Sequence, residues 1–199
     1  MQNLRFPLHF TFKVTTLAND FVATDAGGHT VAYVRQKMLR LKEDIQVYAD
    51  ENRSRELYRI RADRWLDWSA AYAFYDASGR AFGKVARKGW RSLWRAEYGI
   101  VDAHGKARYR IREENGWIKV MDGLVGEIPV LGALTGYVLN PSYVVTDRDG
   151  ASVARIRKRP SFFGRKFRVD RLAPTPGEED DDRILLGLMM MILLERRRG

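Results

Sequence analysis

The chain has 199 residues, 45% of them hydrophobic and 30% charged, so it is long enough for one large domain with a sizeable core and too polar for an integral membrane protein. It contains no cysteine, which excludes disulfides, thiolate catalysis, acylation of cysteine and cysteine-bound zinc, and which fits a reducing compartment. The net charge of +10 favours anionic partners such as phosphate headgroups, nucleic acid or an acidic protein surface.

The first residues, MQNLRFPLHFTFKV, alternate between apolar and polar types and carry charges throughout. A secretory signal needs a continuous apolar stretch, which this segment lacks, so we expect no signal peptide. The alternation instead predicts a first β-strand that contains His9.

A phrase of 13 residues recurs four times along the chain, as DAGGHTVAYVRQK, DASGRAFGKVARK, DAHGKARYRIREE and DRDGASVARIRKR. Each copy has Asp first, Gly fourth and Val or Ile tenth. Asp at the start of a type I turn accepts backbone N–H bonds, and Gly at the fourth position adopts the left-handed conformation that closes a hairpin. We therefore interpret the first residues of the four copies as turn residues rather than catalytic carboxylates; they are Asp25, Asp76, Asp102 and Asp147.

Two weaker turn signals, at Asp50 and at Asp122-Gly123, fill the gaps between the copies. Turns then recur about every 25 residues, which is the length of one hairpin and its connection. An apolar or aromatic stretch precedes each turn and is typical of an incoming strand. Six hairpins predict a mainly β fold in which about twelve antiparallel strands close into a barrel.

Alternation assigns the faces of the strand in the last copy of the phrase. Ala154 and Ile156 fall on one face, and Arg155, Arg157 and Arg159 fall on the other. Because the side-chain period of a strand is two residues, each set shares a face. The third copy alternates in the same way, so we predict arginine rows outside the barrel and aliphatic side chains inside.

Residues 184–194 read ILLGLMMMILL, with acidic residues before them and Glu195 and three arginines after them. A helix that is apolar on every face must be buried all round. Eleven residues span about 16 Å, roughly half of a bilayer core, so we expect this helix inside the barrel and not across a membrane. We place the helix at about 182–196, after an acidic linker at 174–182. Its predicted core residues are Ile184, Leu185, Leu188, Met190, Met191 and Leu194.

Three segments carry a family resemblance: GYVLNPSYVVTDRDGASVARIRKR at 136–159 with the SFFGRKFRV that follows, AFYDASGRAFGKVARK at 74–89, and the final ILLGLMMMILL. The chain resembles the tubby-like, phospholipid-scramblase and LURP-one-related group over about residues 8–197. The resemblance implies one twelve-stranded barrel domain, residues 1–199, around a central C-terminal helix.

The resemblance is less specific about function than about fold. Tubby proteins are associated with phosphoinositide headgroups and scramblases with calcium and lipid movement, but no phosphoinositide-binding motif matches residue for residue. The run EEDDD at 178–182 lacks the alternating oxygen ligands of a compact calcium loop. Lipid scrambling therefore rests on family analogy alone.

The motifs of common enzymes are absent from the sequence. The three histidines, His9, His29 and His104, have no zinc-binding spacing, and neither a GxSxG elbow nor a phosphate-binding GxxxxGK[ST] loop occurs. We therefore expect no enzymatic activity, no cofactor and no metal site.

We hypothesise a cytoplasmic, non-enzymatic binding module that meets anionic lipid headgroups or an acidic partner through its basic outer face, peripherally at the inner side of the membrane and without transmembrane insertion. The alternatives are a sequence-tolerant nucleic-acid-binding protein and a scaffold without a small ligand. The five tryptophans lie among basic residues and suit either an interface or the rim of the barrel. The candidate anion-binding residues are Arg87, Lys88, Arg91, Arg95, Arg155, Arg157, Lys158 and Arg159.

Overall fold

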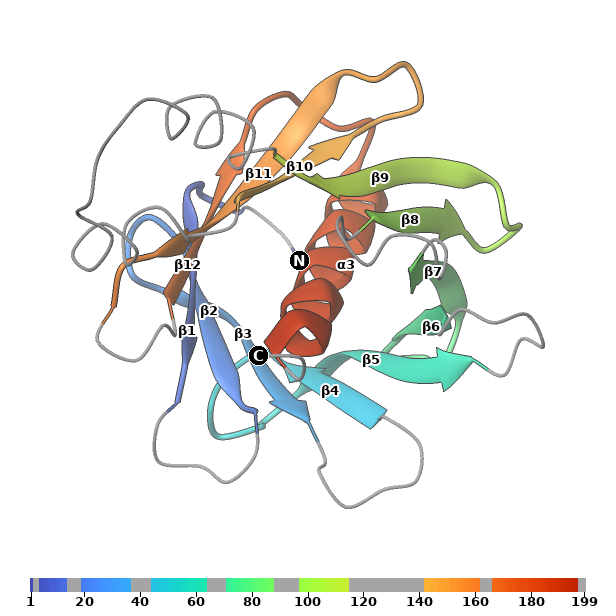
Figure 1. Ribbon diagram of the computed structural model, residues 1–199. Coiled ribbons are helices and arrows are strands. Elements are labelled where there is room, and N and C mark those ends of the chain that lie inside the picture. Colours follow the sequence, from blue (N-terminus) through green and yellow to red (C-terminus); the bar gives the residue numbers. More distant parts are fainter. Residues whose placement is uncertain are drawn as a thin grey trace, which may run out of the picture.

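The computed structural model describes residues 1, 4–13, 19–36, 44–63, 71–87, 97–114, 142–161 and 166–196. Within them, twelve antiparallel strands form a closed barrel, because each strand pairs with its neighbours in the chain and β1 also pairs with β12 (Figure 1). The predicted fold class is confirmed. The strands are β1 (Leu8–Phe12), β2 (Phe21–Thr24), β3 (Thr30–Gln36), β4 (Asp44–Tyr48), β5 (Glu56–Asp63), β6 (Ala71–Asp76), β7 (Ala81–Arg87), β8 (Glu97–Asp102), β9 (Ala107–Glu113), β10 (Ser142–Thr146), β11 (Ser152–Arg159) and β12 (Lys166–Arg171).

The four copies of the repeated phrase form the turns between β2 and β3, β6 and β7, β8 and β9, and β10 and β11. At Asp76, for example, Oδ1 accepts the backbone N–H bonds of Ser78 and Arg80, both at 3.0 Å. Hydrogen bonds from the Ser78 hydroxyl and from Arg80 outweigh partial burial and lower the pKa of the Asp76 carboxyl. The glycine in the fourth position has a positive φ in every copy: 81° at Gly28, 84° at Gly79, 78° at Gly105 and 87° at Gly150.

The turn between β4 and β5 has the same design with one different residue. The Asp50 carbonyl accepts the N–H of Arg53 at 3.1 Å, and Asp50 Oδ1 accepts the N–H of Ser54 at 3.2 Å. Arg53 thus occupies the glycine position, with a φ of 60°. The left-handed conformation is unfavourable for any residue with a Cβ atom. The turn predicted at Asp122-Gly123 lies outside the described residues.

Replacing Arg53 with glycine is expected to raise the free energy of unfolding by about 0.5–1 kcal/mol. Glycine relieves the backbone strain of the folded state, and the greater conformational entropy of glycine in the unfolded chain offsets part of this gain. Urea denaturation measures this change. The reciprocal control is Gly79→Ala, where a Cβ atom has open space around it but the backbone φ is 84°, so the free energy of unfolding is expected to fall. A less stable R53G variant would contradict this account of the turn.

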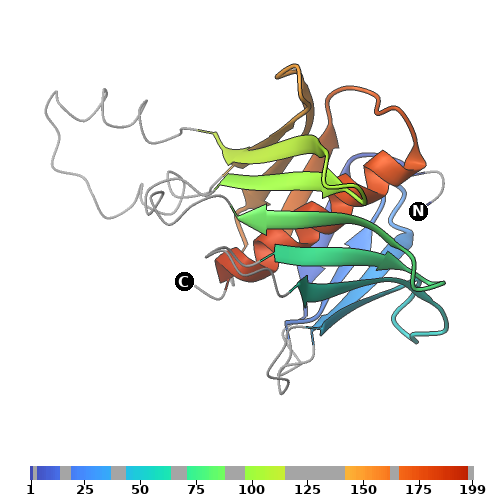
Figure 2. The same ribbon diagram turned by 90° about the vertical axis from the view of Figure 1, so that its right-hand side faces the viewer.

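The helix α3 (Glu178–Arg196) runs through the barrel from one end to the other (Figure 2). It begins at Glu178 rather than at residue 182, so the acidic linker predicted at 174–182 is wrong in its second half. The acids form the first turn of the helix instead, because free backbone N–H groups and the helix dipole favour negative charge there. Of the predicted core residues, Leu194 is only partly buried; the others, Ile184, Leu185, Leu188, Met190 and Met191, are buried.

The helix lies closest to β6, β7 and β8, and glycines allow this approach. A Cβ atom at Gly187 would lie 2.6 Å from Cδ1 of Ile100 on β8. At Gly83 on β7, a Cβ atom would lie 2.9 Å from the Val101 carbonyl oxygen and 3.3 Å from the side chain of Arg183. The lumen is therefore filled by the protein's own helix and the inward side chains of the strands, which leaves the outer face and the two ends of the barrel for partners.

Candidate functional site

The outer face of β11 carries a row of arginines. Arg157 has a side chain that is 51% exposed, whereas Ile156 beside it is fully buried. Arg155 and Arg159 share the outer face with Arg157 because they are two residues away in the strand. The alternation read from the sequence places these three arginines outside the barrel, and the structure agrees.

β12 adds two cations to this row. Its register with β11 sets Arg168 directly opposite Arg157 and Lys166 directly opposite Arg159. We call these five residues the basic strip: Arg155, Arg157, Arg159, Lys166 and Arg168. These two residues of β12 were not predicted from the sequence, although the alternation of polar and apolar residues in KFRVD from residue 166 indicates them.

Part of the strip is neutralised by carboxylates. Asp170 accepts hydrogen bonds from Arg157 Nη2 at 2.8 Å and from Arg168 Nε at 2.7 Å. Burial alone would raise the pKa of Asp170, but these two arginines outweigh it and lower the pKa. Arg155 donates to Oε1 of Glu114 at 2.8 and 3.0 Å.

The end of the strip that is farthest from the β10–β11 turn has no such compensation. Arg159 and Lys166 are both exposed, and neither forms an ion pair with any residue that the structure describes. Among the described residues, no acid therefore compensates the positive charge at this end of the strip.

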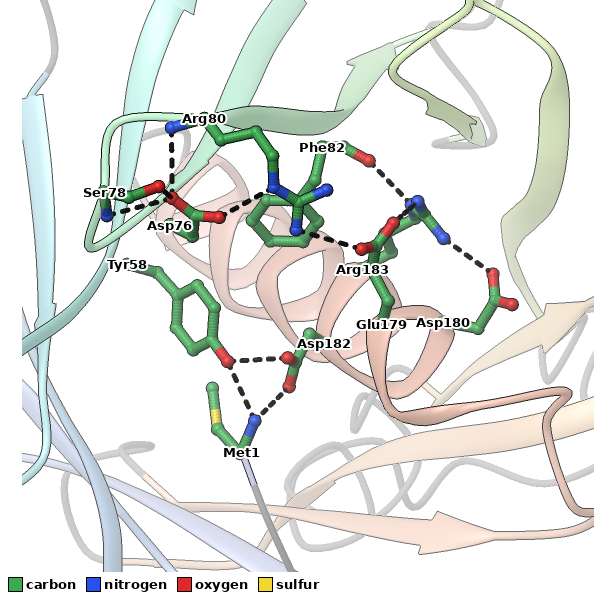
Figure 3. Close-up of polar contacts among 10 residues, drawn as sticks. All are labelled: Met1, Tyr58, Asp76, Ser78, Arg80, Phe82, Glu179, Asp180, Asp182 and Arg183. Atoms are coloured by element: carbon green, nitrogen blue, oxygen red, sulfur yellow. Dashed lines mark hydrogen bonds and ion pairs between the residues drawn. The ribbon is translucent and has the colours of Figure 1, made fainter.

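A second polar site surrounds the start of α3, where four acids each contact a cation from another part of the chain. Figure 3 shows these contacts for Glu179 and Asp182. Asp182 Oδ1 accepts a hydrogen bond from the amino group of Met1 at 2.6 Å, and its Oδ2 accepts one from the Tyr58 hydroxyl at 2.6 Å. Burial and the bond to Asp182 raise the pKa of Tyr58. Asp181 pairs with Arg171 of β12.

Arg183 is the centre of this second site. Its side chain is 8% exposed, and its Nε donates to the carbonyl oxygen of Phe82 at 2.8 Å. Its Nη1 donates to Asp180 at 3.1 Å, and Asp180 also pairs with Arg108 of β9 at 3.0 Å. Glu179 pairs with both Arg183 and Arg80. We call Glu179, Asp180, Asp181, Asp182 and Arg183 with these partners the polar collar.

The acids of the collar are thus occupied by cations of the chain itself. Within the described ranges, no group of three or more histidine, aspartate or glutamate side chains is arranged to hold a metal ion. The part of the chain that is described also contains no helix of the length and apolarity needed to cross a bilayer.

The model of the LURP-one-related family matches residues 30–170 of the chain. This range extends from the start of β3 almost to the end of β12. The chain belongs to the LURP-one-related family. The resemblance to the LURP-one-related family seen in the sequence is thereby confirmed. No curated protein and no solved structure matched the chain.

Two predicted anion-binding residues of this LURP-one-related barrel are not on its outer face. Arg87 shares the inner face of β7 with Val85, and its Nε is buried with no hydrogen-bond partner among the described residues. Lys158 shares the inner side of β11 with Ile156 and is half-buried. The two-residue period of a strand turns both side chains away from the arginine row. The remaining candidates, Lys88, Arg91 and Arg95, and the five tryptophans lie outside the described residues.

Many of the described acids of the LURP-one-related barrel lie at one of its two ends. The five described hairpin turns, which begin with aspartates, and the acidic start of α3 lie at one end, which we call the turn end. Arg159 and Lys166 lie at the opposite end of β11 and β12. Among the described residues, the turns and the start of α3 thus place a group of acids at the end of the barrel away from Arg159 and Lys166.

Proposed function

We propose that this LURP-one-related protein is a non-enzymatic binding module whose basic strip engages the anionic headgroups of membrane phospholipids from the cytoplasmic side. The observation that carries the proposal is the exposed, partly uncompensated row of cations on β11 and β12. The lumen, which could otherwise take a ligand, is filled by α3. A membrane surface offers many anionic groups to such a row without requiring a pocket.

Electrostatics gives the interaction its strength and its direction. A cation near an anionic membrane surface contributes about 1 kcal/mol, and salt weakens the attraction because it falls off within a Debye length. The turn end, where acids are paired with cations of the chain itself, would be attracted less by the same surface. The protein is therefore expected to approach the membrane with the strip and to hold the turn end away.

Vesicle sedimentation tests this proposal with a matched pair of variants. The strip variant carries Arg157→Gln, Arg159→Gln, Lys166→Gln and Arg168→Gln. Loss of four cations is expected to weaken binding to vesicles that contain phosphatidylserine by roughly 100-fold or more. The control removes three arginines and one lysine at the turn end, by Arg53→Gln, Arg55→Gln, Lys106→Gln and Arg148→Gln, and is expected to bind like the unmodified protein.

Three results would contradict the proposal. One is equal recovery of the unmodified protein with phosphatidylcholine vesicles and with phosphatidylserine-containing vesicles. Another is an equal loss of binding in both variants, which would indicate a response to net charge alone. The last is retention of oligonucleotides at protein concentrations at which anionic vesicles bind nothing, which would favour the nucleic-acid alternative.

A further inference from the structure

Four cations of the basic strip form a compact rectangle. Arg157 faces Arg168 and Arg159 faces Lys166 across β11 and β12, and residues directly opposite each other on antiparallel strands have Cβ atoms about 4.5–5.5 Å apart. The two pairs are adjacent on the outer face because they are two residues apart in each strand. We call Arg157, Arg159, Lys166 and Arg168 the cationic rectangle.

Stability of the barrel does not account for this arrangement. Like charges directly opposite each other destabilise a sheet. Elsewhere on the outside, cations lie beside acids: Lys84 pairs with Asp63 at 2.6 Å, and Arg110 pairs with Glu97 at 3.1 Å. In the cationic rectangle, one carboxylate serves two arginines, and the facing cations of the other pair have no acid among the described residues.

The charge and donors of the rectangle indicate the class of its ligand. Four cations and the single carboxylate of Asp170 leave a clear positive excess, which a dianion balances better than a monoanion. The planar guanidinium of arginine donates paired hydrogen bonds to phosphate oxygens, and lysine adds a point charge. Exposed Thr11 lies opposite Lys166 on β1 and adds a hydroxyl group at the edge of the rectangle.

We propose that the cationic rectangle is a binding site for a phosphomonoester group, the terminal phosphate of a lipid headgroup. A phosphomonoester has a second pKa of about 6 and is mostly a dianion at neutral pH, whereas a phosphodiester carries one charge. The site thus prefers headgroups that end in phosphate over headgroups in which phosphate is a bridge. This inference rests on the proposed membrane function and specifies the lipid class within it.

The test compares the full chain on two kinds of vesicle with equal surface charge, one containing phosphatidic acid and the other phosphatidylglycerol. The unmodified protein is expected to bind the phosphatidic acid vesicles about tenfold more tightly near neutral pH, the effect of one additional charge-assisted contact. The preference is expected to shrink as the pH falls through about 6, where the phosphate dianion gains a proton.

A pair of double variants assigns the preference to the rectangle. Arg159→Gln with Lys166→Gln is expected to bind both kinds of vesicle equally, while Arg55→Gln with Lys106→Gln, which removes one arginine and one lysine at the turn end, keeps the tenfold preference. Thermal melting checks that both variants fold. The first comparison uses only the unmodified protein and stands even if a variant fails to fold.

Soluble glycerol 3-phosphate distinguishes the source of the phosphate. If this compound releases the protein from phosphatidic acid vesicles, the site also accepts a free phosphomonoester. If it does not, the site needs the membrane-borne group. Both results support a phosphomonoester site. Equal binding of the unmodified protein to both kinds of vesicle would overturn the site and leave the proposed function intact. Binding to neither would overturn both.

Discussion

Replacing Leu188 with aspartate is expected to remove most or all of the stability of the protein. Leu188 lies in the middle of α3 with no exposed surface, so the carboxylate would be buried among apolar side chains without a partner. Burial of an unpaired charge is among the most destabilising changes known, and a folded domain is stable by only about 5–15 kcal/mol. Urea denaturation is expected to show no cooperative transition. Size-exclusion chromatography is expected to show an expanded or aggregated chain.

Two further variants make this prediction quantitative. Leu188→Ala removes apolar contacts without adding charge and is expected to lower the free energy of unfolding by about 2–5 kcal/mol. Leu172→Asp makes the same chemical change at a leucine that is 42% exposed and is expected to have little effect. A monomeric L188D variant with an unchanged urea midpoint would refute the central position of the helix.

Replacing Arg183 with leucine is expected to lower the free energy of unfolding by about 3–5 kcal/mol, the range for breaking a buried ion pair. The change leaves Asp180, whose side chain is 7% exposed, with Arg108 as its remaining cation, and it leaves the Phe82 carbonyl without the guanidinium donor. Urea denaturation measures this loss as a lower midpoint. The slope of the unfolding free energy against urea concentration is expected to stay unchanged.

The matched control for R183L is Arg80→Leu. Arg80 also pairs with Glu179, but its side chain is 61% exposed, so solvent screens the pair and the loss is expected to be much smaller. The double variant Arg183→Leu with Asp180→Leu removes both buried charges and is expected to recover part of the lost stability. Equal losses in R183L and R80L would show that burial of Arg183 is unimportant.

The polar collar fixes the orientation of the apolar helix inside the barrel. The residues from Ile184 to Leu193 are buried on every side, so apart from the close approach at Gly187 their apolar character does little to specify the rotation of α3 about its axis. The collar fixes the rotation and the depth, since its partners come from β5, β9, β12 and the β6–β7 turn. Arg183, which bonds to the backbone of β7, links the helix to the strand that it approaches closely.

The polar collar and the basic strip differ in how their charges are used. The collar uses its charges internally at the turn end, and the basic strip leaves Arg159 and Lys166 exposed at the opposite end. Substitutions in the collar are therefore expected to change folding, and substitutions at the exposed pair are expected to change binding with little effect on folding. The proposed vesicle experiments depend on this separation.

Local chemistry determined what the sequence alone could predict. The Asp and Gly of each repeated phrase specify a turn with a positive φ at residues such as Gly79, and the apolar segment after residue 183 is too short to span a bilayer and too apolar to be exposed. The two-residue period placed Arg157 outside and Ile156 inside. Each of these inferences depends on residues close together in the chain, which is why the barrel, its turns and its buried helix were predictable.

Only the tertiary structure decided which distant residues meet. The fold brings Arg108 of β9 to Asp180 of α3, and Tyr58 of β5 to Asp182. The acidic run looked like a linker because its cations come from strands far away in the chain. The contacts between segments far apart in the chain and the rotation of a helix depend on the packing of the whole barrel, and no local pattern encodes them.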